Sequence, residues 1–280
     1  MIKLGFPVID LHTHLRNNIP LHTKFAKESG IDVVIYVANS SPPLDNLMAI
    51  KMSLKEKRYC RAIPVSAMTK KLEGKELVEI DKIKPYVVGF SDDGNYLKDL
   101  GLLKEILSRK VLVLAHCSPP YEISVKSPSL ETKFIERYLN LFYRDTKEIK
   151  GWLHIQHLSR KSSVKLIKEA KRKEINLTCE TCPHYFTYSK ADLSVRVNPP
   201  LGSKEDIIAI KEGLYDGTID VIASDYAPLP RKSGIADFRS FLSLSYGLVL
   251  EKDLTKNQLK EKVFLNPRKI IAKGSYKLKI

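Results

Sequence analysis

Residues 8–16 read Val-Ile-Asp-Leu-His-Thr-His-Leu-Arg, an apolar run that ends in two histidines, His12 and His14. Side chains alternate between the two faces of an extended strand, so His12 and His14 would point the same way. Two imidazoles placed like this can bind one metal ion, although paired histidines on a strand also pack against neighbours or meet solvent. The segment therefore predicts a strand with a candidate metal site at its end.

Seven more β-rich apolar runs follow, separated by amphipathic stretches rich in Lys and Glu. This alternation predicts repeated βα units around a parallel sheet. The count of eight predicts an α/β fold, a minimal (β/α)8 TIM barrel whose active site lies at the carboxyl ends of its strands. We expect strands at Val8–Leu11, Asp32–Ala38, Arg61–Ala67, Tyr86–Ser91, Val111–Ala115, Trp152–Gln156, Asn176–Glu180 and Asp220–Ser224, within a single barrel domain over residues 1–280.

The composition limits the classes of partner. The chain has 280 residues, of which 43% are hydrophobic, enough to bury an ordinary core. Since no apolar run approaches the roughly 18 residues of a membrane helix, we expect a cytoplasmic protein with no membrane partner. The net charge of +15 comes from scattered basic residues, which argues against a nucleic-acid partner and favours a small anionic substrate.

The four cysteines are too few for a disulfide scaffold in a chain of this length. Cys179 and Cys182 have the CxxC spacing of some zinc and redox sites. The sequence has no second CxxC to complete a four-cysteine zinc site, and the segment has the pattern of a strand, so we interpret the pair as structural.

Metal-binding residue types recur where the predicted strands end. Because these ends meet at one mouth of a barrel, the side chains are expected to converge there. Imidazole nitrogens and carboxylate oxygens suit Zn²⁺, and a site that keeps one position open for water is catalytic. The residues are His12 and His14 after strand one, Asp92 and Asp93 after strand four, His116 after strand five, His157 after strand six and Asp225 after strand eight.

Six motifs give the chain a resemblance to the amidohydrolase superfamily, and within it to the dihydroorotases. They occur in the family's order between residues 8 and 228, which is far more specific than any one of them. The motifs are DLHTHLR at 10–16, GFSDDG at 89–94, HIQHLS at 154–159, TCETCPH at 178–184, VNPPL at 197–201 and IASDYAP at 222–228.

The resemblance implies a metal-dependent hydrolase that binds one or two zinc ions. His12, His14, His116 and His157 would be ligands, and Asp225 a further ligand and the general base and acid. Zinc can lower the pKa of bound water to about 7, which provides the nucleophile that opening a cyclic amide requires. Where many relatives bridge two metals with a carboxylated lysine, this chain resembles the dihydroorotases that use an aspartate, with Asp92 as the first choice and Asp93 as the second.

The implied reaction is the reversible hydrolysis and cyclisation that connects (S)-dihydroorotate and N-carbamoyl-L-aspartate in de novo pyrimidine biosynthesis. Arg16 and Asn39 resemble the family's binders of the substrate carboxylate, and Asn198 would contact the ring. His154 and His184 are interpreted as supporting or structural residues. Two alternatives stay open, namely another cyclic amidase of the hydantoinase or allantoinase type, and a non-catalytic barrel that partners another enzyme of the pathway.

The chain also departs from the family. Leu229 stands where active dihydroorotases usually have a histidine that helps to hold the substrate carboxylate, and Gly202 replaces a common arginine. Another group, such as Tyr226, Arg196 or Arg231, could make the missing contact. We further expect no accessory β-sandwich, which many superfamily members carry, and we expect a homodimer.

Overall fold

The computed structural model describes residues 4–276, apart from 146, 193–194, 229–234 and 236. Its named strands all pair in parallel and in chain order, forming one sheet of three strands and one of four. The strands are β1 (Ile9–Thr13), β2 (Val33–Tyr36), β3 (Arg61–Pro64), β4 (Leu112–Ala115), β5 (Trp152–Ile155), β6 (Leu177–Thr181) and β7 (Val221–Ile222).

Two short contacts close the sheets into a barrel. Phe90 bridges Ser66 on one side and Val113 on the other, so this segment fills the place of the fourth predicted strand. Tyr226 bridges Thr13 and joins the last strand to the first. The predicted eight-unit barrel is therefore confirmed, although the segment predicted as a strand over 86–91 pairs only around Phe90.

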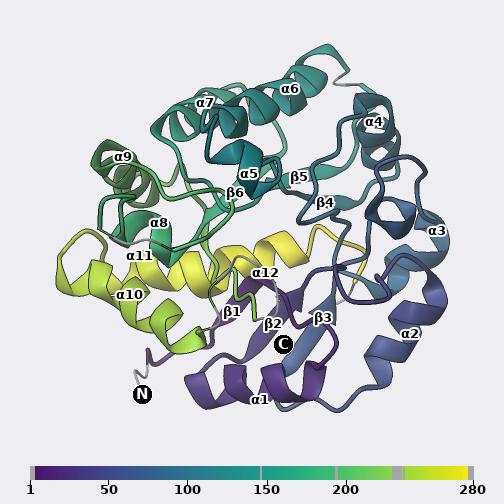
Figure 1. Ribbon diagram of the computed structural model, residues 1–280, viewed down its shortest axis with the longest axis horizontal. Helices are drawn as coiled ribbons and strands as arrows, with labels where there is room; N and C mark the ends of the chain where they lie inside the picture. The colour runs from purple at the N-terminus through teal and green to yellow at the C-terminus, as the bar shows by residue number, and fades with distance from the viewer. Residues whose placement is uncertain (1–3, 146, 193–194, 229–234, 236, 277–280) are drawn as a thin grey trace.

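Helices surround the strands on the outside (Figure 1). Their buried sides pack against the sheet, and none in the described part of the chain is long and apolar enough to cross a membrane. The longer ones are α1 (Ile19–Ser29), α2 (Leu47–Lys55), α4 (Leu100–Ser108), α6 (Leu130–Arg144), α7 (Lys161–Arg172), α9 (Lys204–Tyr215) and α10 (Phe238–Leu250). The shorter ones are α3 (Ile80–Ile83), α5 (Tyr121–Ser124), α8 (Pro183–Thr187), α11 (Lys256–Lys260) and α12 (Asn266–Ile271). There are also 3-10 turns at Lys70–Leu72 and Lys84–Tyr86 and a π-helical turn at Glu261–Leu265.

The barrel interior is a separate apolar cluster. Inward-facing residues such as Ile9, Leu11 and Leu114 pack there with Ile270 and Ile271 of α12. The α12 helix lies against the amino end of the barrel, because the Asn266 amide donates to the Asp220 carbonyl just before β7. The polar side chains that follow the strand ends converge at the opposite, carboxyl end.

Gly89 allows the fourth segment to approach β4 closely. A Cβ atom at this position would lie 2.5 Å from the Leu112 carbonyl oxygen and 2.8 Å from a methyl carbon of Leu114. The Gly89 carbonyl also accepts a hydrogen bond from the Ser66 amide at 3.0 Å. The close approach fixes the segment that carries Asp92 and Asp93 to the mouth of the barrel.

We predict that Gly89→Ala lowers the free energy of unfolding by about 1–3 kcal/mol, because the added methyl group overpacks against backbone. Gly247→Ala is the matched control, since a Cβ there meets nothing within 4 Å and lies inside α10. Urea denaturation followed by circular dichroism measures both. Equal stability of the two variants would contradict the packing argument.

Candidate metal centre

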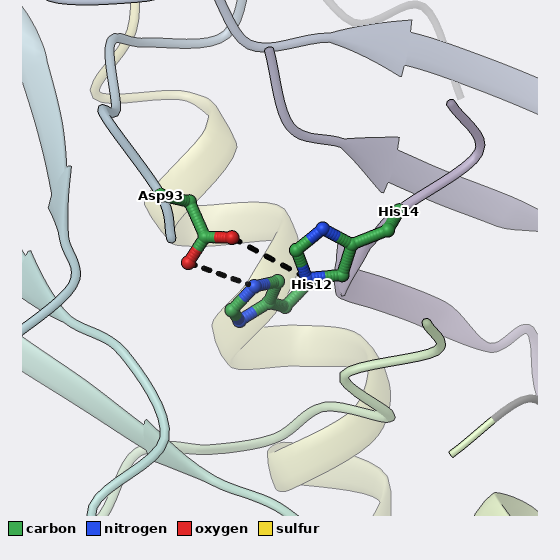
Figure 2. Close-up of side chains that lie close together, drawn as sticks. All are labelled: His12, His14 and Asp93. Carbon is green, nitrogen blue, oxygen red and sulfur yellow. Dashed lines mark ion pairs between the residues drawn. The ribbon is translucent and has the colours of Figure 1, made fainter. Parts of the chain in front are cut away.

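Two histidines of the centre, His12 in β1 and His14 directly after it, face an aspartate from across the barrel (Figure 2). Both imidazoles are buried. Nε2 of His12 lies 3.5 Å from Oδ1 of Asp93, and Nε2 of His14 lies 3.3 Å from Oδ2 of the same carboxylate. The three residues form one group of possible metal ligands.

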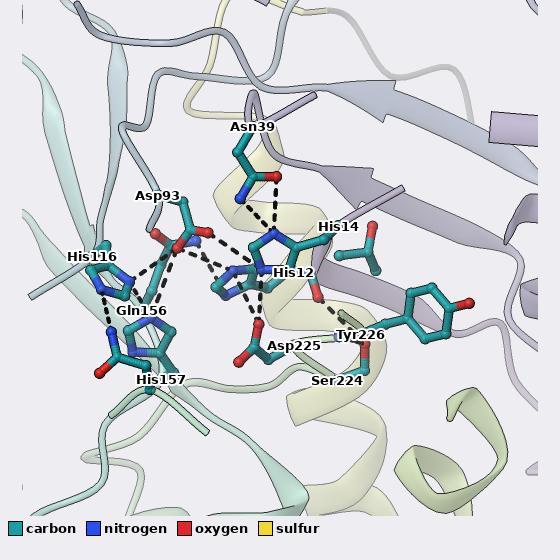
Figure 3. Close-up of polar contacts among 12 residues, drawn as sticks. His12, His14, Asn39, Asp93, His116, Gln156, His157, Ser224, Asp225 and Tyr226 are labelled. Carbon is teal, nitrogen blue, oxygen red and sulfur yellow. Dashed lines mark hydrogen bonds and ion pairs between the residues drawn. The ribbon is translucent and has the colours of Figure 1, made fainter. Parts of the chain in front are cut away.

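Asp93 also belongs to a second group, formed with His116 after β4 and His157 after β5 (Figure 3). Nδ1 of His116 lies 3.1 Å from Oδ1 of Asp93 and 2.8 Å from Nε2 of His157. All of these side chains are buried. One carboxylate thus lies between two pairs of histidines, which is the arrangement of a binuclear metal site.

The nitrogen and oxygen atoms of the cluster are placed to bind a metal ion, because hydrogen bonds among them leave a buried atom without a partner within the described residues. Nδ1 of His12 contacts Oε1 of Glu180 at 2.6 Å, so its proton is needed there and Nε2 presents a lone pair to the cluster. Buried Nε2 of His12 has no hydrogen-bond partner among the described residues. Since buried polar atoms seldom stay unsatisfied, the clusters suit two divalent cations.

Asp93 is the aspartate that enters the cluster, which corrects the sequence-based preference for Asp92. The Asp92 carboxylate accepts hydrogen bonds from the backbone amides of Met68 at 2.8 Å and Thr69 at 3.0 Å, and from the Thr69 hydroxyl. It therefore fixes the loop after β3. The sequence could not separate the two neighbours, because the strand pairing ends at Phe90 and its alternation does not extend to either of them.

Asp225 lies beside the first pair of histidines. Its Oδ1 is 3.0 Å from Nε2 of His14 and 3.7 Å from Nε2 of His12. Burial alone would raise the pKa of Asp225, but the hydrogen bond with His14 and the charges of the neighbouring histidines hold this pKa well below its ordinary value. The carboxylate is therefore ionised at neutral pH.

The backbone around Asp225 is held in an unusual conformation. Asp225 has a φ of 49°, in the left-handed region that L-residues seldom adopt. The Ser224 amide donates to Oδ1 of Asp10 at 2.9 Å, and the Tyr226 amide donates to the Ser224 hydroxyl at 2.9 Å. These bonds fix the residues on both sides of Asp225 and aim its side chain at the histidines.

Glu180 contacts the ring nitrogen of His12 that faces away from Asp93, a role that the sequence did not reveal. It lies in β6, with Oε1 on His12 and Oε2 3.0 Å from Nε2 of His154. Burial alone would raise the pKa of Glu180, but the two histidines lower it to about 2. A buried carboxylate inside an otherwise uncharged strand was the available signal, since such a charge needs a partner.

A pocket of about 210 Å³ opens over the centre. Arg16, Asn39 and Asn198, the predicted substrate-binding residues, all line it. Asn39 also contacts Nδ1 of His14, and the Asn198 amide nitrogen lies 3.4 Å from Nε2 of His116. Both asparagines therefore touch candidate ligands as well as the space where a substrate would bind.

No protein-family model matches the chain. A dihydroorotase of Caldicellulosiruptor saccharolyticus is 33% identical over 305 residues, which cover 94% of this chain and 71% of that protein. A dihydroorotase of Thermoanaerobacter sp. is 31% identical and covers 95% of this chain and 72% of its own length. The chain belongs to the dihydroorotase family.

Solved structures show the same fold at lower sequence identity. The L-hydantoinase (dihydropyrimidinase) from Arthrobacter aurescens aligns with a TM-score of 0.80 and 22% identity, over 95% of this chain and 70% of that one. The inactive dihydroorotase-like domain of a Chaetomium thermophilum CAD-like multifunctional protein aligns with a TM-score of 0.69 and 16% identity, over 95% of this chain and 79% of that domain's chain. These likenesses confirm the barrel prediction.

The candidates for replacing the dihydroorotase histidine differ in position. Leu229 and Arg231 lie outside the described residues. The Tyr226 hydroxyl contacts Nδ1 of His22 at 2.8 Å, and its ring stacks on Phe238, so it supports the loop. Arg196 lines the pocket.

Gly202, the other departure from the dihydroorotase pattern, has a packing reason in this chain. A Cβ there would lie 2.7 Å from side-chain atoms of Asp206. Asp206 caps α9 together with Ser203 and pairs with Arg160 at 3.4 Å. A larger residue at 202 would displace this capping carboxylate, so the usual arginine would not fit here without rearrangement.

We predict that Asp93→Asn removes at least one bound metal ion, because the amide lacks the charge that two cations would share. Asp92→Asn is the matched control and should retain the metal while lowering thermal stability, because it weakens the bonds to Met68 and Thr69. Inductively coupled plasma mass spectrometry after dialysis gives the stoichiometry. Loss of metal from the Asp92 variant alone would restore the original assignment.

Glu180→Gln should weaken metal binding by about 10–100-fold, the usual effect of removing a carboxylate that orients a ligating histidine. The variant keeps the side-chain shape but loses the charge that fixes the tautomer of His12. Competition with a chromophoric chelator measures the affinity. An unchanged affinity would assign Glu180 a role in folding only.

Proposed function

We propose that this protein is a zinc-dependent dihydroorotase that interconverts (S)-dihydroorotate and N-carbamoyl-L-aspartate. The observation that carries the proposal is the position of Asp93 between two histidine pairs, with ionised Asp225 beside them in a pocket that Arg16 also lines. The family supplies the reaction class, and the two arginines of the pocket wall, Arg16 and Arg196, favour an anionic cyclic amide.

Divalent zinc held by the two clusters would polarise the amide carbonyl and lower the pKa of a water molecule. His12 and His14 with Asp93 would hold one ion, and Asp93 with His116 and His157 the other. Asp225 would take a proton from the attacking water at a carboxylate oxygen as the new C–O bond forms. It would then deliver that proton to the ring nitrogen as the C–N bond breaks, and the reverse sequence closes the ring.

Arg16 lies in the loop just after β1 and holds the substrate's carboxylate in this proposal. Its backbone has a φ of 49°, which turns the chain after the two histidines, and its side chain reaches the pocket wall. A planar guanidinium can bind a carboxylate through two parallel hydrogen bonds. The amide to be cleaved would then lie over the histidine cluster.

A second candidate function is hydrolysis of a cyclic amide without a carboxylate, such as hydantoin. Leu229 favours it, because the hydrocarbon side chain cannot make the hydrogen bond of the usual histidine. Arg16 disfavours it, since a guanidinium in the pocket gains little from a neutral substrate. The non-catalytic alternative is disfavoured by the complete set of candidate ligands.

We predict turnover of dihydroorotate by the zinc-loaded protein, with Asp225→Asn slowing it by about 10²–10⁴-fold, the contribution of a positioned general base. The loss of ring amide absorbance in the ultraviolet follows the reaction. Removal of metal by a chelator should abolish turnover, and zinc should restore it.

The outcomes separate the alternatives. Turnover of hydantoin but not dihydroorotate would favour the second candidate. Bound zinc with turnover of neither compound would favour the non-catalytic alternative, and an Asp225→Asn protein as active as the wild type would remove Asp225 from the proton transfer.

A further inference from the structure

A cation at the pocket wall is paired with a carboxylate of the same wall. Nη2 of Arg196 lies 2.5 Å from Oε1 of Glu122, and its guanidinium lies over the ring of Tyr121 at 4.5 Å. All three residues line the pocket that contains Asp93 and Asp225. The ion pair therefore occupies the wall of the space into which an anionic substrate would enter.

We propose that Arg196 is a second anchor for the substrate carboxylate and that Glu122 is the internal carboxylate which the substrate displaces from it. The inference rests on the proposed function, since it assigns the recognition of an acidic cyclic amide to this site. It also supplies a contact in place of the histidine missing at Leu229.

The segment that carries Arg196 is fixed close to the metal centre. Asn198, two residues later, contacts Nε2 of His116, and its amide nitrogen donates to the Pro119 carbonyl at 3.1 Å. Pro119 directly precedes the loop and short helix α5 that present Tyr121 and Glu122. The hydrogen bond between Asn198 and Pro119 therefore joins the two segments that carry Arg196 and Glu122, beside the histidine cluster.

The pair is suited to exchange because water reaches both groups. The side chains of Arg196 and Glu122 are 40% and 64% exposed, and ion pairs with this exposure contribute little to stability. Glu122 contacts the guanidinium through Nη2, and Nε of Arg196 is a buried donor with no hydrogen-bond partner within the described part of the chain. A substrate carboxylate would take the place of Glu122 at this planar cation, which can bind both carboxylate oxygens.

Tyr121 explains how the guanidinium keeps its place during the exchange. The aromatic face attracts the cation whether or not Glu122 is bound. The Tyr121 ring therefore sets the orientation of Arg196, while the carboxylate bound to the guanidinium changes from that of Glu122 to that of the substrate. A neutral amide lacks the charge to compete with Glu122, so the pair would discriminate in favour of acidic substrates.

The test compares steady-state kinetics on dihydroorotate for zinc-loaded wild type, Arg196→Gln, Arg196→Lys, Glu122→Gln and the double variant. Arg196→Gln should raise KM by about tenfold with little change in kcat, because a charge-assisted contact made in the bound state is lost. Arg196→Lys should recover part of this loss. Glu122→Gln should lower KM by about two- to threefold, as expected for removing an exposed competitor.

The double variant and a matched control test whether the effect of Glu122 depends on Arg196. The double variant should have the KM of Arg196→Gln, because Glu122 has nothing to compete for once the cation is gone. Glu251→Gln removes a carboxylate that is 63% exposed and paired with Lys211 outside the pocket, and its KM should equal that of the wild type. An unchanged KM in Arg196→Gln would overturn the anchor, and an unchanged KM in Glu122→Gln would overturn the exchange even if the arginine variants failed to fold.

Calorimetric binding of dihydroorotate to zinc-loaded Asp225→Asn protein separates this inference from the proposed function. Binding that weakens when Arg196→Gln is added supports the anchor even if the wild type shows no turnover. If the wild type turns over dihydroorotate but Arg196→Gln leaves its binding affinity unchanged, the proposed function stands and the inference is overturned. A protein that neither binds nor converts dihydroorotate would overturn both.

Discussion

The structure depends on one buried carboxylate that two pairs of histidines approach. Burial alone would raise the pKa of Asp93, but the charges of His14 and His12 and the hydrogen bond with His116 hold it well below its ordinary value. A lone charge at this depth would be costly, so the surrounding imidazoles are a condition for keeping Asp93 ionised. The ionised carboxylate in turn gives both histidine pairs a common negative centre.

The barrel brings these groups together from distant parts of the sequence. His12 lies in the first strand and His14 follows it. Asp93 follows the fourth segment, and His116 and His157 follow the next two strands. Closure through Phe90 and Tyr226 therefore does more than complete the sheet, because these two bridges place Asp93 and Asp225 beside the histidines. The isolated bridges at Phe90 and Tyr226 thus lie next to the two carboxylates of the centre, Asp93 and Asp225.

Most of the fold and much of the site could be predicted from the sequence. The regular βα period gave the barrel, and strand ends gave His12, His14, His116, His157 and Asp225, because the carboxyl ends of parallel strands must meet at one mouth. The choice between Asp92 and Asp93 could not be made this way. It is decided by where the backbone amides of Met68 and Thr69 lie, which is a tertiary contact that no local pattern encodes.

The cover at the amino end of the barrel has a consequence for how the chain folds. Strand β1 and helix α12 are far apart in the sequence, yet Ile9 and Leu11 share one apolar cluster with Ile270 and Ile271. During synthesis the first strand would leave the ribosome long before its cover exists. The apolar amino end of the nascent barrel would therefore stay uncovered until α12 docks, which lengthens the time for which the emerging chain exposes apolar surface.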